Sequence, residues 1–189
     1  MRLFVAIELD DEARHAVAKA QQDVARTVAG SDGRAIKWVR PHHLHVTLAF
    51  LGEVPDARVA DITRTIERDI RVPPFAAVLG GLGVFPTRGA PRALWLGLRD
   101  GGASVAATRR EIDARLNHSG IALEPRVLHP HVTLARWRAS RPADARLVSD
   151  AHCDGEIARL VVDHVTLFHS KLSAGGPTYC ALTRVTLTP

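Results

Sequence analysis

The chain has 189 residues, 46% of them apolar, which is enough to build one domain or two small fused lobes around a buried core. Two cysteines far apart, and no apolar stretch of membrane-spanning length, argue against a disulfide-rich scaffold, a zinc knuckle and a membrane span. The N-terminal run is typical of a strand rather than a signal peptide, so we expect a cytoplasmic protein, by default a monomer.

The formal net charge is +5, and 22 of the 25 basic residues are arginine. An arginine excess favours a phosphate-bearing partner, because the guanidinium group binds phosphate through two parallel hydrogen bonds. The arginines are scattered rather than clustered, however, and genomic base composition explains the excess equally well.

Hydrophobic periodicity predicts strands alternating with helices along the chain. Asp10 is placed to cap the first helix, Gly30 to end it, and Pro73 and Pro74 to stop the second. In chain order we expect a strand at 2–9, a helix at 10–30, strands at 36–39 and 44–51, a helix from Pro55 that includes Ile70, strands at 75–85 and 92–98, a helix ending near Gly120, a strand at 131–137, a short helix at 143–149, and strands at 157–168 and 178–187.

The tetrapeptide His-Val-Thr-Leu occurs at residues 45–48 and again at residues 131–134. A predicted strand and then a helix precede each copy, which indicates a duplication. We therefore expect residues 1–189 to form a single bilobal α+β domain. In this fold two mainly antiparallel sheets face a central groove, and the helices pack outside.

Alternate residues of a strand point to the same face, so each copy presents one histidine and one threonine together. If the lobes are related by an approximate twofold axis, His45 and His131 meet in one cavity with Thr47 and Thr133. Two imidazoles suit the opening of a cyclic phosphodiester, in which one takes a proton from water and the other protonates the departing ribose oxygen. The threonine hydroxyls are then placed to hold the phosphate oxygens.

Arg136 is a further candidate for phosphate binding, although its position on the strand requires a bulge or a long reach. His43 and His129 lie two residues before the motif histidines, so His-x-His pairs that bind a metal are an alternative. A non-catalytic nucleotide-binding module is another. Thr47 argues against a histidine-triad hydrolase, which needs a third histidine there. The remaining histidines, such as His164, are expected at the surface or in packing.

The whole chain resembles the two-histidine phosphoesterase superfamily, specifically the RNA 2′,3′-cyclic phosphodiesterase family, also called the 2′-5′ RNA ligase family. The segments that carry the resemblance are Phe4–Ile7, Trp38–Pro41, His45–Gly52, Pro91–Gly97, Pro130–Arg136, and Ser170 and Leu172 with Gly176 and Tyr179. Leu128 and His129 stand where the family often has an aromatic residue before the second motif.

The resemblance implies an enzyme that hydrolyses RNA or nucleoside 2′,3′-cyclic phosphodiesters to 2′-phosphomonoesters. It implies no metal and no cofactor, with His45 as the proton donor to the 3′ oxygen and His131 as the proton acceptor from water. Phe50 and Arg136 match family positions near the substrate. Family members are also associated with the reverse reaction, the 2′-5′ ligation of RNA ends.

Overall fold

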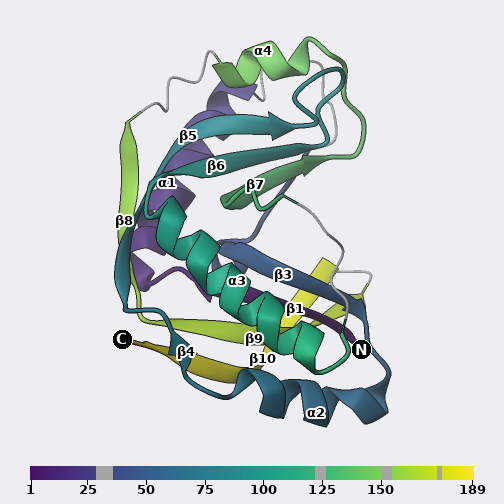
Figure 1. Ribbon diagram of the computed structural model, residues 1–189. Helices are drawn as coiled ribbons and strands as arrows, with labels where there is room; N and C mark the ends of the chain where they lie inside the picture. The colour runs from purple at the N-terminus through teal and green to yellow at the C-terminus, as the bar shows by residue number, and fades with distance from the viewer. Residues whose placement is uncertain (29–35, 122–126, 150–154, 174–175) are drawn as a thin grey trace.

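The computed structural model describes residues 1–28, 36–121, 127–149, 155–173 and 176–189, which form helices packed on an extended sheet (Figure 1). The helices are α1 (Asp11–Val28), α2 (Asp56–Ile66), α3 (Gly102–His118) and α4 (Asp144–Ser149), with a 3-10 turn η1 (Pro41–His43). The strands are β1 (Arg2–Glu8), β2 (Ile36–Trp38), β3 (His45–Glu53), β4 (Ile70–Arg71), β5 (Phe75–Phe85), β6 (Ala93–Asp100), β7 (His131–Trp137), β8 (Glu156–Val162), β9 (His164–Ser173) and β10 (Gly176–Thr188).

The strands follow one hydrogen-bonded path, β4-β10-β9-β1-β3-β7-β6-β5-β8, and β2 pairs with β7. The mixed α+β class expected from the sequence is therefore present. Hydrogen bonding joins the strands in one path rather than in two separate sheets. β3 and β7 pair at a single position, Val46 opposite Val132. This single-pair connection is the narrow joint between the two halves of the sheet.

The two halves of this path repeat the same register around the two His-Val-Thr-Leu segments. In the first half, β1 places Glu8 opposite His45 and Ile7 opposite Val46. In the second half, β6 places Gly97 opposite His131 and Leu96 opposite Val132. A register shift follows at the same step in both halves. At the joint between the halves, the equivalent residues Val46 and Val132 pair with each other.

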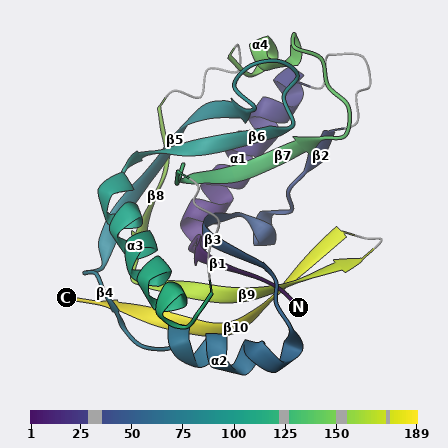
Figure 2. The same ribbon diagram turned by 45° about the vertical axis from the view of Figure 1, so that its right-hand side comes forward.

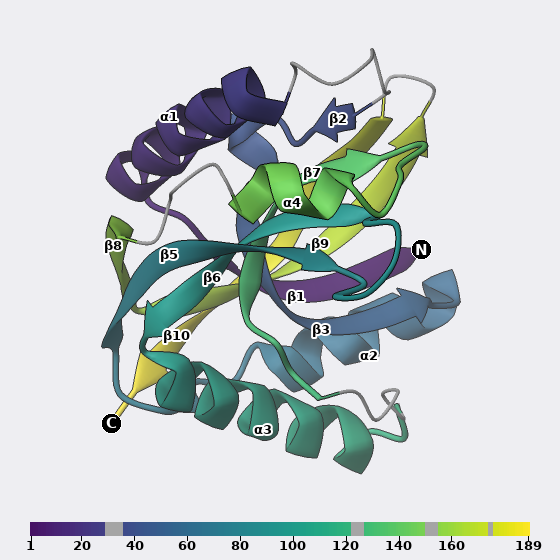
Figure 3. The same cartoon turned by 90° about the horizontal axis from the view of Figure 1, so that it is seen from above.

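Each half contributes a long helix that packs on the other half. The helix α1, which follows β1, contacts β8 and α4, while α3, which follows β6, contacts β3 and β4. Viewed from above, α1 and α3 lie on opposite sides of the strands (Figure 3). The helices therefore tie the two half-sheets together across the single pair that joins β3 to β7.

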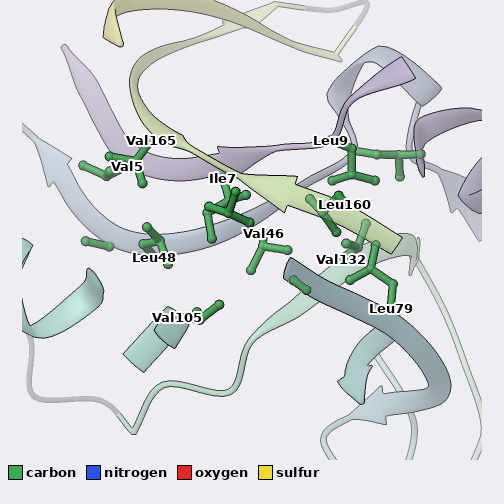
Figure 4. Close-up of a cluster of buried hydrophobic side chains, with 14 of the residues drawn as sticks. Val5, Ile7, Leu9, Val46, Leu48, Leu79, Val105, Val132, Leu160 and Val165 are labelled. Atoms are coloured by element: carbon green, nitrogen blue, oxygen red, sulfur yellow. The ribbon is translucent and has the colours of Figure 1, made fainter. Parts of the chain in front are cut away.

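The buried core is continuous through that joint. Val46 and Val132 are 2% and 0% exposed, and they pack with apolar side chains of both half-sheets and of α3 (Figure 4). Because side chains alternate along a strand, burial of these valines turns the neighbouring histidines and threonines to the other face. No helix in the described ranges is long and apolar enough to cross a bilayer.

Most predicted elements are present, and Asp10 caps α1 by accepting a hydrogen bond from the Ala13 amide at 2.8 Å. Two assignments were wrong. Ile70 is not helical but lies in β4, next to β10. The predicted strand at 157–168 is two strands, because the chain leaves the ladder at Asp163. His43, which lies between two predicted strands, is in η1. The predicted helix end at Gly30 lies outside the described residues.

Candidate active site

His45, Thr47, His131 and Thr133 lie on one face of the narrow joint between β3 and β7. The antiparallel pairing of Val46 with Val132, extended by one residue each way, places His45 across from Thr133 and Thr47 across from His131. The two histidines are then diagonal neighbours, a relationship that separates them by roughly 7–8 Å in a regular ladder. The structure thus brings the four predicted motif residues together in one quartet.

A backbone carbonyl fixes the orientation of each imidazole. The Nδ1 of His45 lies 2.7 Å from the carbonyl oxygen of His43, and the Nδ1 of His131 lies 2.7 Å from that of His129. A carbonyl only accepts hydrogen bonds, so each Nδ1 must carry a proton and donate it. In a neutral ring the Nε2 is therefore unprotonated. Both rings are held as the tautomer that can take or give a proton at Nε2.

The first imidazole lies against an aromatic wall built from three strands. The ring centroid of His45 is 5.1 Å from that of Phe4 and 5.4 Å from that of Tyr179, and Phe168 stacks behind Phe4. The Nε2 of His45 lies 3.1 Å from the hydroxyl of its strand neighbour, Thr47. The second imidazole has a separate wall, in which Phe85 and Trp95 lie 5.2 and 6.0 Å from His131.

These surroundings make both imidazoles hard to protonate. Burial, aided by the charges of His43, His131 and Arg136, lowers the pKa of His45 to about 4, although the hydrogen bond to the His43 carbonyl opposes the shift. Burial also lowers the pKa of His131, and the charges of His129 and Arg136 act in the same direction. Both rings are accordingly neutral at pH 7 when the site holds no anion.

A bulge in each motif strand brings one more side chain to the histidine face. Leu48 in β3 and Leu134 in β7 have no partner at the register shift, and each is buried together with the alanine after it. This extra inward residue reverses the alternation, so Phe50 and Arg136 point to the same side as the histidines. The bulge that Arg136 requires is therefore present.

A ring contact of Phe50 and the electrostatic effect of Arg136 place both side chains near the quartet. Phe50 is 65% exposed, and its ring lies 6.2 Å from that of Phe4 beside His45. Arg136 is exposed, and its charge lowers the pKa values of both His45 and His131. It also opposes the rise that burial causes in the pKa of Tyr179.

Side chains from α1 and α3 hydrogen-bond the two bulges. Gln21 of α1, only 7% exposed, donates from Nε2 to the carbonyl oxygen of Leu134 at 2.8 Å and to that of Val39 at 2.9 Å. Arg109 of α3 donates from Nη1 to the carbonyl oxygen of Leu48 at 2.5 Å. The helix of each half thus binds the bulged carbonyl in the other half's motif strand. The sequence analysis missed both residues, because neither belongs to a motif.

The structure gives His43 and His129 a role other than metal binding. Neither residue lies on the strand of its motif histidine, although the ring of His129 lies 6.2 Å from that of His131. Their carbonyl oxygens orient the motif rings instead. Among the residues that the structure describes, no group of three or more histidine, cysteine, aspartate or glutamate side chains is arranged to hold a metal ion.

A third His-Val-Thr-Leu segment, in addition to the two predicted as a repeat, lies at residues 164–167 at the start of β9. Its threonine is buried and donates from Oγ1 to the carboxylate of Glu8 at 2.5 Å. The Nδ1 of His164 lies 2.6 Å from the carboxylate of Asp163 rather than from a carbonyl. This copy is engaged in packing between β1 and β9. The tetrapeptide alone therefore does not define the site.

A family model described as the 2'-5' RNA ligase superfamily matches residues 9–173. The chain belongs to this superfamily. A protein of Aeropyrum pernix named RNA 2',3'-cyclic phosphodiesterase is 33% identical over 171 residues, which are 89% of this chain and 93% of that protein. A protein of the same name from Thermus thermophilus is 31% identical and aligns over 99% of this chain and 90% of its own length.

Two solved structures share the fold. A crystal structure from Thermus thermophilus has a TM-score of 0.75 and 30% identity, with 99% of this chain and 98% of that chain covered. The structure of LigT from E. coli complexed with 3'-AMP has a TM-score of 0.72 and 28% identity, covering 100% of this chain and 98% of that one. The superfamily resemblance stated from the motifs is confirmed over nearly the whole chain.

Proposed function

We propose that this protein is an enzyme that hydrolyses 2′,3′-cyclic phosphodiesters, on RNA ends or on nucleosides, to 2′-phosphomonoesters. The observation that carries the proposal is the diagonal pair His45 and His131, each held by a backbone carbonyl at Nδ1. Relatives that cover most of the chain bear the name RNA 2',3'-cyclic phosphodiesterase, which supports the same reaction.

In the proposed step, the oxygen of a water molecule attacks phosphorus while the bond from phosphorus to the 3′ oxygen breaks. The Nε2 of His131 takes the proton of the attacking water, and the Nε2 of His45 gives its proton to the departing 3′ oxygen. The two groups must lie on opposite sides of phosphorus, and the diagonal of the quartet supports that placement. All four side chains come from one chain, so a monomer suffices.

The low pKa values of the free site fit this chemistry once the substrate is bound. One imidazole must be protonated in the reactive complex, and burial disfavours this in the empty site. The negative charge of a cyclic phosphate favours the protonated form, so substrate binding raises both pKa values. The enzyme thereby gains its proton donor when the anion that needs it is present.

Thr47 and Thr133 are proposed to donate hydrogen bonds to the non-bridging oxygens of the phosphate, and Arg136 to neutralise the charge that builds there. Phe50, largely exposed beside Phe4, is proposed as a surface for a base or ribose. We also infer that the two halves are duplicated lobes of one domain, because their motif strands repeat the same register and the same bulge. Ligation of RNA ends through a 2′-5′ bond is proposed as the same displacement with a 5′ hydroxyl in place of water: the 5′ oxygen bonds to phosphorus, the bond to the 3′ oxygen breaks, and the 3′ oxygen takes a proton.

The direct test is product analysis after incubation with a nucleoside 2′,3′-cyclic phosphate in the presence of a chelator. The proposal predicts the 2′-phosphomonoester as product, at the same rate with and without chelator. A protein that binds the nucleotide without turnover would be a binding module. Activity lost to the chelator and restored by zinc would instead favour a metal-dependent phosphoesterase.

A further inference from the structure

A hollow of about 310 Å³ lies just before the start of β7, where β6 ends and α3 begins (Figure 2). Four of the described residues that line it are glycines, namely Gly80, Gly81, Gly97 and Gly102, and none of them is arginine, lysine, aspartate or glutamate. Its volume is at the lower end of the range for small-molecule sites, about 300–1,000 Å³. The hollow therefore has the size and the lining for one uncharged group rather than for a run of phosphates.

The hollow adjoins the imidazole that is proposed to activate the attacking water. Gly97 of β6 lies directly opposite His131 in the ladder. Residues opposite each other on antiparallel strands share a face, with Cβ positions about 4.5–5.5 Å apart. Two side chains that line the hollow also lie near this imidazole, since the rings of Trp95 and His129 are 6.0 and 6.2 Å from that of His131. A molecule bound in the hollow is therefore a neighbour of the proposed base.

The two halves of the sheet differ at this position, although their motif strands share one register. Glu8 lies opposite His45 in the first half, where Gly97 lies opposite His131 in the second. The carboxylate of Glu8 accepts hydrogen bonds from Thr166 at 2.5 Å and from Arg184 at 2.9 Å, so side chains of the first half occupy that position. The hollow is therefore specific to the side of the quartet on which His131 lies.

Backbone carbonyls and aromatic rings give the hollow the character of a nucleoside site. A Cβ atom at Gly97 would lie 3.4 Å from the carbonyl oxygen of Gly80 and 3.6 Å from that of Gly81, so both oxygens converge on this glycine. Neither residue pairs with β6, because the register skips both. The rings of Trp95 and His129 lie 4.8 Å apart on the same hollow. Carbonyl oxygens accept hydrogen bonds from amino and hydroxyl groups, and aromatic rings pack on a base.

We propose that this hollow binds a neutral nucleoside with a free 5′ hydroxyl, and that the enzyme transfers the cyclic phosphate to that hydroxyl in competition with water. The inference depends on the proposed function for the roles of the two histidines. The Nε2 of His131 takes the proton of the 5′ hydroxyl, and the 5′ oxygen bonds to phosphorus. The bond from phosphorus to the 3′ oxygen breaks, and the Nε2 of His45 gives that oxygen its proton. The product is a 2′-5′ diester with a free 3′ hydroxyl.

The test supplies adenosine to the enzyme together with a nucleoside 2′,3′-cyclic phosphate and measures both products, the 2′-5′ dinucleoside monophosphate and the 2′-phosphomonoester. The rate of diester formation should saturate as adenosine rises, because the acceptor binds before it reacts. Methanol, which has a hydroxyl but no base, should give a rate that rises linearly and stays far lower at equal concentration.

The variant Gly102→Leu is designed to fill the hollow. A Cβ atom at Gly102 has no other atom within 4 Å, so the new side chain displaces no neighbour. It is expected to lower the ratio of diester to monoester by roughly tenfold, since added side-chain atoms in a pocket change discrimination by about 10- to 200-fold. Because both products come from the same enzyme molecules, a loss of folded protein does not alter the ratio.

The matched control is Ala103→Leu, at the next exposed residue of α3, which does not line the hollow. The control should keep the wild-type ratio. Absence of the diester, a rate linear in adenosine, an unchanged ratio in Gly102→Leu or an equal fall in both variants would overturn the acceptor site. In each of those cases the 2′-phosphomonoester still forms and the proposed function stands. If the cyclic phosphate is not hydrolysed even without adenosine, the proposed function fails as well.

Discussion

Gln21 in the middle of α1 hydrogen-bonds the carbonyl of Leu134, 113 residues away in the second motif strand, at 2.8 Å. That carbonyl belongs to the bulge that turns Arg136 toward the histidines. The hydrogen bond thus connects a buried amide, which takes no part in the proposed reaction, with the position of Arg136, the side chain proposed to bind phosphate.

Replacement of Gln21 by leucine removes both hydrogen bonds and leaves the Val39 carbonyl without the partner it has at 2.9 Å. We expect the free energy of unfolding to fall by about 1–3 kcal/mol, and kcat/KM to fall by roughly tenfold because Arg136 loses its fixed position. Urea unfolding and steady-state kinetics measure the two effects. Gln22→Leu changes an exposed neighbour and is the control. Unchanged kinetics in a destabilised Gln21 variant would show that the position of Arg136 does not depend on the Gln21 hydrogen bonds.

The three His-Val-Thr-Leu segments allow the threonine roles to be separated. Thr47→Val and Thr133→Val keep the side-chain shape and remove only the hydroxyl, so each is expected to lower kcat by roughly 10- to 100-fold with little effect on stability. Thr166→Val is expected to lower stability with little effect on kcat, because the Thr166 hydroxyl binds Glu8 in a buried position. Kinetics and thermal unfolding on all three variants decide the matter. A comparable loss of activity from Thr166→Val would mean that the hydroxyls act through the fold.

The pH dependence of kcat/KM should be bell-shaped, with its maximum below pH 6.5. This parameter reports the free enzyme, in which one imidazole must be protonated and the other neutral, and burial lowers both pKa values. The bound anionic substrate raises both values, so the profile of kcat should shift to higher pH. The limbs belong to the coupled pair rather than to single residues. A monotonic profile, or one that peaks above pH 7 in kcat/KM, would contradict the paired roles.

The low pKa of His45 also has a consequence for stability. Between pH 6.5 and about 4 the unfolded chain binds a proton at His45 that the folded site does not bind. The free energy of unfolding therefore decreases as the pH falls through that range. At pH 4.5 the cost is about 2–3 kcal/mol and at pH 7 it is absent. Relative to wild type, His45→Gln should therefore gain that amount between pH 7 and pH 4.5 in urea unfolding. His15→Gln, at an exposed position, is the matched control.

The sequence supported the elements and the quartet because both depend on local patterns. Alternation and helical spacing predicted nearly every strand and helix, and the repeated tetrapeptide led to His45, Thr47, His131 and Thr133. The third tetrapeptide shows the limit of that argument. In the first two copies, the histidine Nδ1 hydrogen-bonds the backbone carbonyl of the second residue before it. Every residue has such a carbonyl, so a residue pattern cannot show which copies make this hydrogen bond.

Features that depend on contacts between distant segments could not be predicted. The bulges at Leu48 and Leu134 look like ordinary strand positions, and Gln21 and Arg109 look like ordinary helix residues. Ile70 fits the helical spacing of α2, but pairing with β10 places it in a strand. In each case tertiary contacts decide the outcome, and the local sequence carries no record of them.

Turnover of a nucleoside 2′,3′-cyclic phosphate by His45→Ala, His131→Ala and the double variant tests the central claim most directly. If the two imidazoles act as one acid and base pair, each single variant should lose roughly 10²- to 10⁴-fold in kcat, and the double variant should be little worse than either single one. A single variant that retains near wild-type kcat, or losses that multiply in the double variant, would contradict the account.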